Sequence, residues 1–212
     1  MSLKKKKILI TAGPTWVAID KVRVISNIAS GKTGLLLARQ AKKLGADVTL
    51  LMGPTENSFS NNCIKVKPFK YFDDFKDLFT KEINKNYAVL IHSAAVSDYQ
   101  PKESSSDKIR SDLKRLSLDL VLTPKLADRV KKKNPNVFLV LFKLELNVSK
   151  SALIDRAFGL LKNTKADLVI ANTFKDNHYR AYIVDKNKKI IGQATDKNRL
   201  TRLLIRRIEE RI

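Results

Sequence analysis

Short apolar runs alternate with segments of helical periodicity along this chain, and this alternation limits its possible folds more than any other feature. Residues 8–12 are apolar and end at Gly13-Pro14, which predicts a buried strand stopped by a turn. Residues 34–44 place apolar side chains three and four positions apart, as in a helix with one buried face. A second apolar run over 47–52 completes a β-loop-α-β unit, whose strands we expect to be parallel with a right-handed crossover.

The same alternation continues to the C-terminus. It predicts strands over 87–92, 116–122, 137–142 and 167–171, helices over 71–83, 124–132, 151–162 and 197–210, and a hairpin over 180–194. Strands that alternate with helices are typical of a doubly wound α/β sheet. We therefore predict a Rossmann-like α/β fold with a mostly parallel sheet, formed by a single domain over residues 1–212, to which the hairpin and the 116–122 strand are additions.

Charge and composition exclude several classes of protein. The 42 Lys and Arg residues against 21 acidic residues give a formal net charge of +21, which attracts polyanions and phosphorylated small molecules alike. Because these basic residues are spread along the chain, a solvated lysine-rich surface is the favoured interpretation of most of the charge. No apolar run approaches the roughly 20 residues that a membrane-spanning helix needs. The single cysteine, Cys63, allows no intramolecular disulfide, and we expect a reducing cytoplasm.

A polar, glycine-containing segment over 26–34 leads into the first predicted helix. The free N–H groups and positive dipole end of such a helix start bind phosphate, so we predict nucleotide contacts at Gly13, Ser30, Gly31 and Lys32. The alternative is a helix start that merely requires small residues. A Walker A loop is excluded, because it needs glycine where Ser26 stands and follows its strand directly. The dinucleotide-binding pattern G-x-G-x-x-G is also absent.

Asn27 lies in an otherwise apolar stretch over 22–28. Its amide both donates and accepts hydrogen bonds, which suits an acyl carbonyl or a developing oxyanion. Considered by itself, an asparagine at this place is more typical of a turn or a helix cap.

A second candidate segment follows the predicted strand over 87–92. Ligands of open α/β sheets bind beyond the carboxyl ends of the strands, and the small residues Ser93, Ala94 and Ala95 allow a nucleotide to approach the backbone. Asp98 is a candidate ligand for magnesium or for a sugar hydroxyl. We interpret His92 as a core or supporting residue rather than a catalytic base.

Two further positions can be interpreted either as part of the site or as ordinary structure. Lys108 lies in a polar loop over 97–113, which is either a mobile flap that closes over a triphosphate or a solvated basic loop. Phe142 ends a predicted strand, and its ring either stacks on a base or belongs to the core.

Taken together, these segments resemble the phosphopantothenate–cysteine ligase family over essentially the whole chain. The resemblance is carried, in order, by Ala12-Gly-Pro-Thr15, Ile19-Asp20, Val22-Arg23, Ile25-Ser-Asn27, Ser30-Gly-Lys32, Gly34, Ser93-Ala-Ala-Val96, Asp98-Tyr99, Lys108-Ile109, Thr123-Pro124, Phe142, Glu145, Asp167-Leu168 and Ala171-Asn172. It implies a reaction in which a nucleoside triphosphate, CTP or alternatively ATP, activates the carboxylate of 4′-phosphopantothenate with Mg²⁺. The amine of cysteine then attacks the acyl-nucleotide intermediate.

The resemblance also implies roles for individual residues. It makes Asn27 and Lys108 catalytic, the first at the activated acyl group and the second on the phosphates. It assigns the nucleotide site to Ala95 and Asp98, and the base pocket to Pro124, Lys125, Leu126, Ala127 and Phe142. Family members are homodimers in which extra strands, such as 116–122 or 180–194, help to form the partner's site. The decarboxylase domain often fused to bacterial ligases is not part of this sequence, so the resemblance is to a stand-alone form.

Ala29 and the pair Lys143-Leu144 depart from the bacterial pattern, and the second departure leaves the choice between CTP and ATP open. A nicotinamide-dependent reductase remains the first alternative, although no Tyr-x-x-x-Lys pattern supplies its proton donor. A nucleic-acid-binding module is the second, although aromatic residues make up only 7% of the chain. We expect neither nucleic acid nor membrane as a partner.

Overall fold

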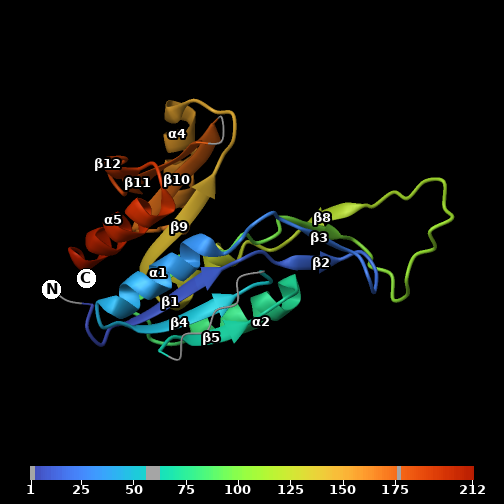
Figure 1. The fold of residues 1–212 in the computed structure, drawn as a ribbon, viewed down its shortest axis with the longest axis horizontal. Helices are drawn as coiled ribbons and strands as arrows, with labels where there is room; N and C mark the ends of the chain where they lie inside the picture. The colour runs from blue at the N-terminus through green and yellow to red at the C-terminus, as the bar shows by residue number, and fades with distance from the viewer. Residues whose placement is uncertain (1–2, 56–62, 176–177) are drawn as a thin grey trace.

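The computed structural model describes residues 3–55, 63–175 and 178–212. Eight strands form one sheet in the order β12-β11-β10-β9-β6-β1-β4-β5 (Figure 1). They are β1 (Lys7–Ala12), β4 (Asp47–Met52), β5 (Lys65–Pro68), β6 (Val89–His92), β9 (Phe138–Leu144), β10 (Leu168–Lys175), β11 (His178–Asp185) and β12 (Ile190–Ala194). The strands from β10 to β5 are parallel to one another, and β11 and β12 add an antiparallel hairpin. The predicted mostly parallel sheet with an added hairpin is confirmed.

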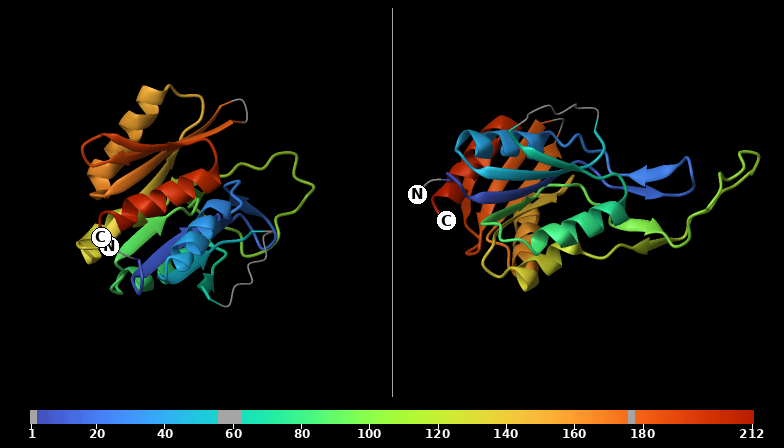
Figure 2. Two further views of the ribbon diagram at one scale, coloured as in Figure 1. Left: turned by 60° about the vertical axis from the view of Figure 1, so that its left-hand side comes forward. Right: turned by 90° about the horizontal axis from the view of Figure 1, so that it is seen from below.

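Helices cover both faces of this sheet (Figure 2). On one face α1 (Lys32–Lys43) and α5 (Lys197–Glu209) share a buried apolar cluster with the sheet. On the other face lie α2 (Phe72–Ile83), α4 (Lys150–Thr164), the 3₁₀ turn η1 (Leu126–Arg129) and the short helix α3 (Val130–Lys133). Successive side chains of a strand point to opposite faces, and accordingly Ile8 and Ile10 of β1 join the first cluster whereas Leu9 joins the second.

The start of α1 packs directly against the carboxyl ends of β1 and β6. A Cβ atom added at Gly34 would lie 2.4 Å from the Cβ of Ala12 and 3.0 Å from the Oγ of Ser93. No side chain fits between the helix and the strands at this point. Gly34 therefore allows the first turn of α1 to come close to the ends of both strands.

Two antiparallel strand pairs extend away from the edge of the sheet where these strands end (Figure 1). β2 (Trp16–Ala18) pairs with β3 (Val24–Ser26), and β7 (Tyr99–Pro101) pairs with β8 (Leu120–Leu122). We refer to residues 16–26 and 99–122 as the arm. The loop over 102–119 forms its far end.

The strand predicted over 116–122 alternates apolar and polar residues, a pattern typical of a half-buried strand, and the structure differs from this in two respects. The strand β8 spans only Leu120–Leu122, and none of the alternating leucines is buried. Leu116, Leu118, Leu120 and Leu122 are 49%, 37%, 42% and 67% exposed. The alternating pattern indicates a surface that is suited to being covered, but no described part of this chain covers it.

The helix predicted over 124–132 is divided into the 3₁₀ turn η1 and the four-residue α3. The strands β2, β3, β5 and β7 were not predicted, because each is only three or four residues long and shows no clear periodicity. Within the described residues, no helix combines the length and the apolar composition required to cross a bilayer.

The close approach at Gly34 gives a paired stability prediction. Gly34→Ala forces a methyl group into Ala12, so we expect it to destabilise the protein by about 1–3 kcal/mol despite the higher helix propensity of alanine. Gly159→Ala is the matched control, because Gly159 lies within α4 and its added Cβ meets no atom within 4 Å. That substitution is expected to stabilise by about 0.5–1 kcal/mol. Urea unfolding measures both, and shifts of the same sign would contradict this account.

Candidate functional site

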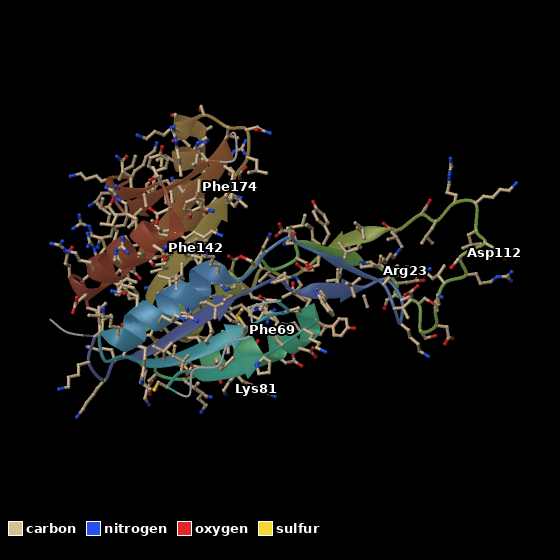
Figure 3. All side chains as sticks on the ribbon, in the orientation of Figure 1. Arg23, Phe69, Lys81, Asp112, Phe142 and Phe174 are labelled. Atoms are coloured by element: carbon tan, nitrogen blue, oxygen red, sulfur yellow. The ribbon has the colours of Figure 1, made fainter. Side chains whose placement is uncertain are left out.

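A cavity of about 830 Å³ lies at the carboxyl edge of the parallel strands. Its wall is formed by the start of α1, the loops that follow β1 and β6, the segment over 123–128, the ends of β9 and β10, and the first residues of β11 and α5. In Figure 3, Phe142 and Phe174 lie on the side formed by β9 and β10, while Arg23 and Asp112 lie on the arm. This is the edge at which ligands of open α/β sheets bind.

The loops after β1 and β6 are joined by hydrogen bonds that fix the centre of the wall. Ser93 Oγ donates to the carbonyl oxygen of Thr11 at 2.7 Å, and Ala94 N–H donates to Thr11 Oγ1 at 3.2 Å. Further along, Ser97 N–H donates to Thr15 Oγ1 at 2.9 Å. Both threonines are fully buried, so the small residues between them are held by contacts that exclude water.

The first turn of α1 faces this wall with little competition for its N–H groups. Its N-cap, Gly31, has a left-handed backbone with φ 67°, and no side chain caps the helix. Ser30 Oγ accepts from Lys32 N–H only at a long distance of 3.4 Å. The turn carries no acidic residue. An uncapped helix start of this kind suits an anion.

The amide of Asn27 has a defined orientation. Its Nδ2 donates to the carbonyl oxygens of Ala95 and Val96 at 3.3 and 3.2 Å, so the nitrogen must point to the loop after β6. The acceptor Oδ1 has no donor among the described residues. Asn27 therefore offers the cavity an acceptor for an N–H or O–H group, rather than a donor for an oxyanion as the sequence alone had indicated.

His92 is not placed to act as a base. Its Nδ1 forms a hydrogen bond with Thr11 Oγ1 at 2.7 Å, and its ring stacks on Phe75 with the centroids 6.0 Å apart. Burial lowers the pKa of His92 to about 4, so the imidazole is neutral at pH 7. The interpretation of His92 as a supporting residue is confirmed.

Two carboxylates, Asp98 and Asp128, line the cavity. Asp98 is ion-paired with Lys125. No group of three or more metal-ligating side chains occurs in the described parts of the chain. These donors do not form a magnesium site by themselves, but one carboxylate is sufficient where the ion arrives on substrate phosphates. Magnesium at Asp98 stays a prediction on that condition.

The four lysines that line the cavity fall into two pairs. Lys125 is matched by Asp98, and Lys143 Nζ lies 3.0 Å from Glu145 Oε1. Lys32 and Lys197 have no carboxylate partner in residues 3–55, 63–175 and 178–212. Burial lowers the pKa of Lys197, and the nearby charge of Lys32 lowers it further.

The structure brings together all the predicted site residues except one. The residues of the prediction that line the cavity are Gly13, Asn27, Ser30, Gly31, Lys32, Ser93, Ala94, Ala95, Asp98, Pro124, Lys125, Leu126, Ala127 and Phe142. Their contacts with a nucleotide stay predictions.

Lys108 does not line this cavity, because its loop is attached to the far end of the arm. The neighbouring Ile109 N–H donates to Asp20 Oδ2 at 3.1 Å, and Arg23 Nη1 donates to the carbonyl oxygen of Ile109 at 3.1 Å. Burial alone raises the pKa of Asp20, but amide hydrogen bonds from Val22, Ile109 and Arg23 outweigh it and lower the pKa to about 2. The ionised carboxylate holds this loop to the tip of the β2–β3 hairpin.

Part of the cavity wall consists of residues that were not among the predicted site residues. Asn172, Phe174, Tyr179 and Lys197 all line it. Asn172, which belongs to the motif Ala171-Asn172, lies within β10, and its Oδ1 is buried without a hydrogen-bond partner in the described structure. Lys197 was placed at a helix start, and only the packing of α5 beside α1 brings it to the cavity.

Comparisons with known proteins agree with this geometry. Residues 3–212 match the family described as "DNA/pantothenate metabolism flavoprotein C-terminal domain". The chain is 37% identical over 213 residues to the coenzyme A biosynthesis bifunctional protein CoaBC of Thermococcus kodakarensis, covering 100% of this chain and 51% of that protein. The chain thus spans about half the length of the curated relatives that it matches.

Solved structures show the same fold. The DNA/pantothenate metabolism flavoprotein from Streptococcus pneumoniae superposes with a TM-score of 0.86 at 28% identity, covering 97% of this chain and 99% of that one. The C-terminal domain of a CoaBC protein gives a TM-score of 0.80 at 25% identity, covering 99% of this chain and 97% of that one.

The Asp20 contacts predict how the arm loop can be released. Asp20→Asn removes the charge that holds Ile109 and Arg23, so we expect trypsin to cleave after Lys108 or Arg110 at least about tenfold faster than in the wild type. Asp107→Asn is the control, because the ion pair between Asp107 and Lys21 is exposed and contributes little. Equal cleavage rates for Asp20→Asn and the wild type would show that the loop is held by other contacts.

Proposed function

Because the chain belongs to the DNA/pantothenate metabolism flavoprotein C-terminal domain family, we propose that it is a ligase that joins 4′-phosphopantothenate to L-cysteine. The carboxylate of phosphopantothenate attacks the α-phosphate of a nucleoside triphosphate and pyrophosphate leaves. The amine of cysteine then attacks the acyl carbon and the nucleoside monophosphate leaves. The matched relative is named for coenzyme A biosynthesis, and we place this reaction in that pathway.

The observation that carries this proposal is a cavity with strong means of binding anions and no activated protein nucleophile. An uncapped helix start offers positive charge, as do two lysines without a carboxylate partner among the described residues. The imidazole in the wall, His92, is partly buried and neutral at pH 7. Such a site suits a reaction whose nucleophiles both belong to the substrates, since the protein then contributes positioning and charge neutralisation.

Asn27 is placed to act in the second step. Its Nδ2 is held by the backbone of Ala95 and Val96, which leaves Oδ1 to accept a hydrogen bond from the attacking amine. Accepting that hydrogen bond orients the nitrogen lone pair toward the acyl carbon. Asn27 would thus direct the collapse of the intermediate rather than its formation.

The base and the magnesium ion of the nucleotide would bind at different parts of the cavity. Phe142 and the segment over 124–127 form a wall with an aromatic ring for the base, and CTP, or alternatively ATP, would lie there. Magnesium carried on the phosphates would be held at Asp98 and would neutralise their charge. We further infer a single domain acting in the cytoplasm, since one sheet collects strands from Lys7 to Ala194 and a single cysteine allows no intramolecular disulfide.

We also propose a homodimer that uses the arm. The arm exposes several large apolar side chains on its strands, in the turn between β2 and β3 and in its far loop: Val22, Val24, Tyr99, Leu113, Leu116, Leu118, Leu120, Val121 and Leu122. An apolar surface of this kind indicates an interface. Docking of the arm on a second copy would also bring Lys108 toward a cavity that it does not reach in its own protomer.

Pyrophosphate release tests the ligase. With phosphopantothenate, Mg²⁺ and cysteine, we expect release with CTP or with ATP, and the preferred nucleotide is identified by the faster rate. Asn27→Ala should lower amide formation by about 100-fold while the acyl-nucleotide still forms, because only the second step loses its contact. No release with either nucleotide from folded wild-type protein would reject the ligase, and nicotinamide binding would be tested next.

Sedimentation tests the dimer. Leu120→Asp with Leu122→Asp places two charges on the exposed apolar surface of β8, and we expect it to convert a dimer into a monomer with an unchanged circular dichroism spectrum. Ile190→Asp is the control, because Ile190 is similarly exposed, at 40%, but lies on β12. A monomeric wild type, or a variant that remains dimeric, would contradict the proposed interface.

A further inference from the structure

The pairing of the cavity lysines points to a ligand at one particular place. Lys125 and Lys143 are matched by Asp98 and Glu145, so their charges are already neutralised within the protein. Lys32 and Lys197 lack such a partner in the part of the chain that the structure describes. The unmatched positive charge of the cavity is therefore concentrated at these two side chains.

Lys32 and Lys197 meet because α1 and α5 run side by side. Each lysine is the first residue of its helix, and the two helices pack against each other on the same face of the sheet. Both helices begin at the carboxyl edge of the parallel strands, as Figure 1 shows. The uncapped N-terminus of α1 and the two lysines thus belong to the same end of the cavity wall.

This arrangement costs free energy in the absence of a ligand. Burial and the charge of Lys32 both lower the pKa of Lys197, so its protonated form is disfavoured where it stands. Within the described residues the adjacent Asp196 makes no ion pair with it, and its carboxylate caps α5 instead by accepting from Arg199 N–H at 2.8 Å. An anion bound between the two lysines would remove this cost.

The surrounding wall also contains an unused polar group. Asn172 lines the same cavity and its buried Oδ1 has no partner in the described structure. Tyr179 and Phe174 line it as well, with their ring centroids 5.2 Å apart. A buried acceptor without a donor is costly to leave unpaired, which indicates that a ligand with an N–H or O–H group near its anion occupies this region.

We propose that Lys197, together with Lys32, forms a phosphate-binding site at the α5 end of the cavity. The inference rests on the proposed function, which supplies two sources of phosphate: the polyphosphate of the nucleotide and the phosphate of phosphopantothenate. The chemistry of recognition is the same for both. Lys197 adds a binding residue from the last helix of the chain to a site that otherwise consists of earlier segments.

Calorimetric titration tests this site without turnover. Inorganic pyrophosphate, CTP, ATP and phosphopantothenate are titrated separately into the wild type and into Lys197→Met. We expect Lys197→Met to weaken at least one of these ligands by about tenfold or more, since an ammonium–phosphate hydrogen bond is lost. Weaker pyrophosphate and nucleotide binding identifies the polyphosphate as the ligand group. A loss confined to phosphopantothenate identifies the phosphorylated acid.

Two matched variants separate a binding role from a structural one. Lys197→Arg keeps the positive charge and should retain most of the affinity. Lys150 is the first residue of another capped helix, α4, and its ammonium lies over the Tyr182 ring rather than at the cavity. The variant Lys150→Met should therefore bind all four ligands like the wild type. Thermal unfolding confirms that each variant is folded.

Unchanged affinity of folded Lys197→Met for all four ligands would overturn the inference, and so would equal losses in Lys197→Met and Lys150→Met. The outcome is independent of the ligase assay. A protein that binds pyrophosphate through Lys197 but forms no amide would retain the phosphate site and lose the proposed function. A protein that forms the amide but binds all four ligands equally well without Lys197 would retain the proposed function and lose the phosphate site.

Discussion

The close packing of the α1 start on the ends of β1 and β6 is the constraint on which the rest of this structure depends. Gly34 leaves no room for a side chain between the helix and Ala12, and Gly31 adopts the left-handed conformation that turns the chain into the helix. Because the helix begins so close to the strands, its N–H groups face the loops that follow β1 and β6. A wider spacing would separate the anion-binding helix start from the loop after β6, and the cavity would lose one wall.

Within that cavity, buried polar groups position the loops, whereas charged groups are available to bind ligands. The threonines that join the loops after β1 and β6 are fully buried, and their hydroxyl groups bond backbone N–H groups and the side chains of His92 and Ser97, so they position without reacting. His92 is partly buried, and this burial keeps its imidazole neutral at pH 7. Of the four lysines in the wall, two are ion-paired with carboxylates, and two have no such partner in the part of the chain that the structure describes. The cavity is thus rigid at its centre and electrostatically unsatisfied at the end formed by α1 and α5.

The arm is held together by polar contacts, while its apolar side chains stay exposed. Its strand pairs have only three residues per strand, and its leucines remain exposed. Its far loop is nevertheless held by one buried carboxylate, Asp20, which gathers two segments about 90 residues apart in sequence. An element that is locally ordered by polar contacts but leaves its apolar side chains uncovered is suited to contact another protein surface.

The sequence by itself determined the α/β alternation, most helix and strand positions, and the segments that line the cavity. These features depend on local periodicity and on residues such as Gly31 and Asn27, whose backbone or hydrogen-bonding character is visible in one dimension. Only the tertiary structure decided which lysines remain unpaired, that Asn27 offers an acceptor, that Lys108 lies away from its own cavity, and that Lys197 belongs to the site. Ion pairing, amide orientation and helix packing depend on distances between residues remote in sequence, and periodicity carries no information about those distances.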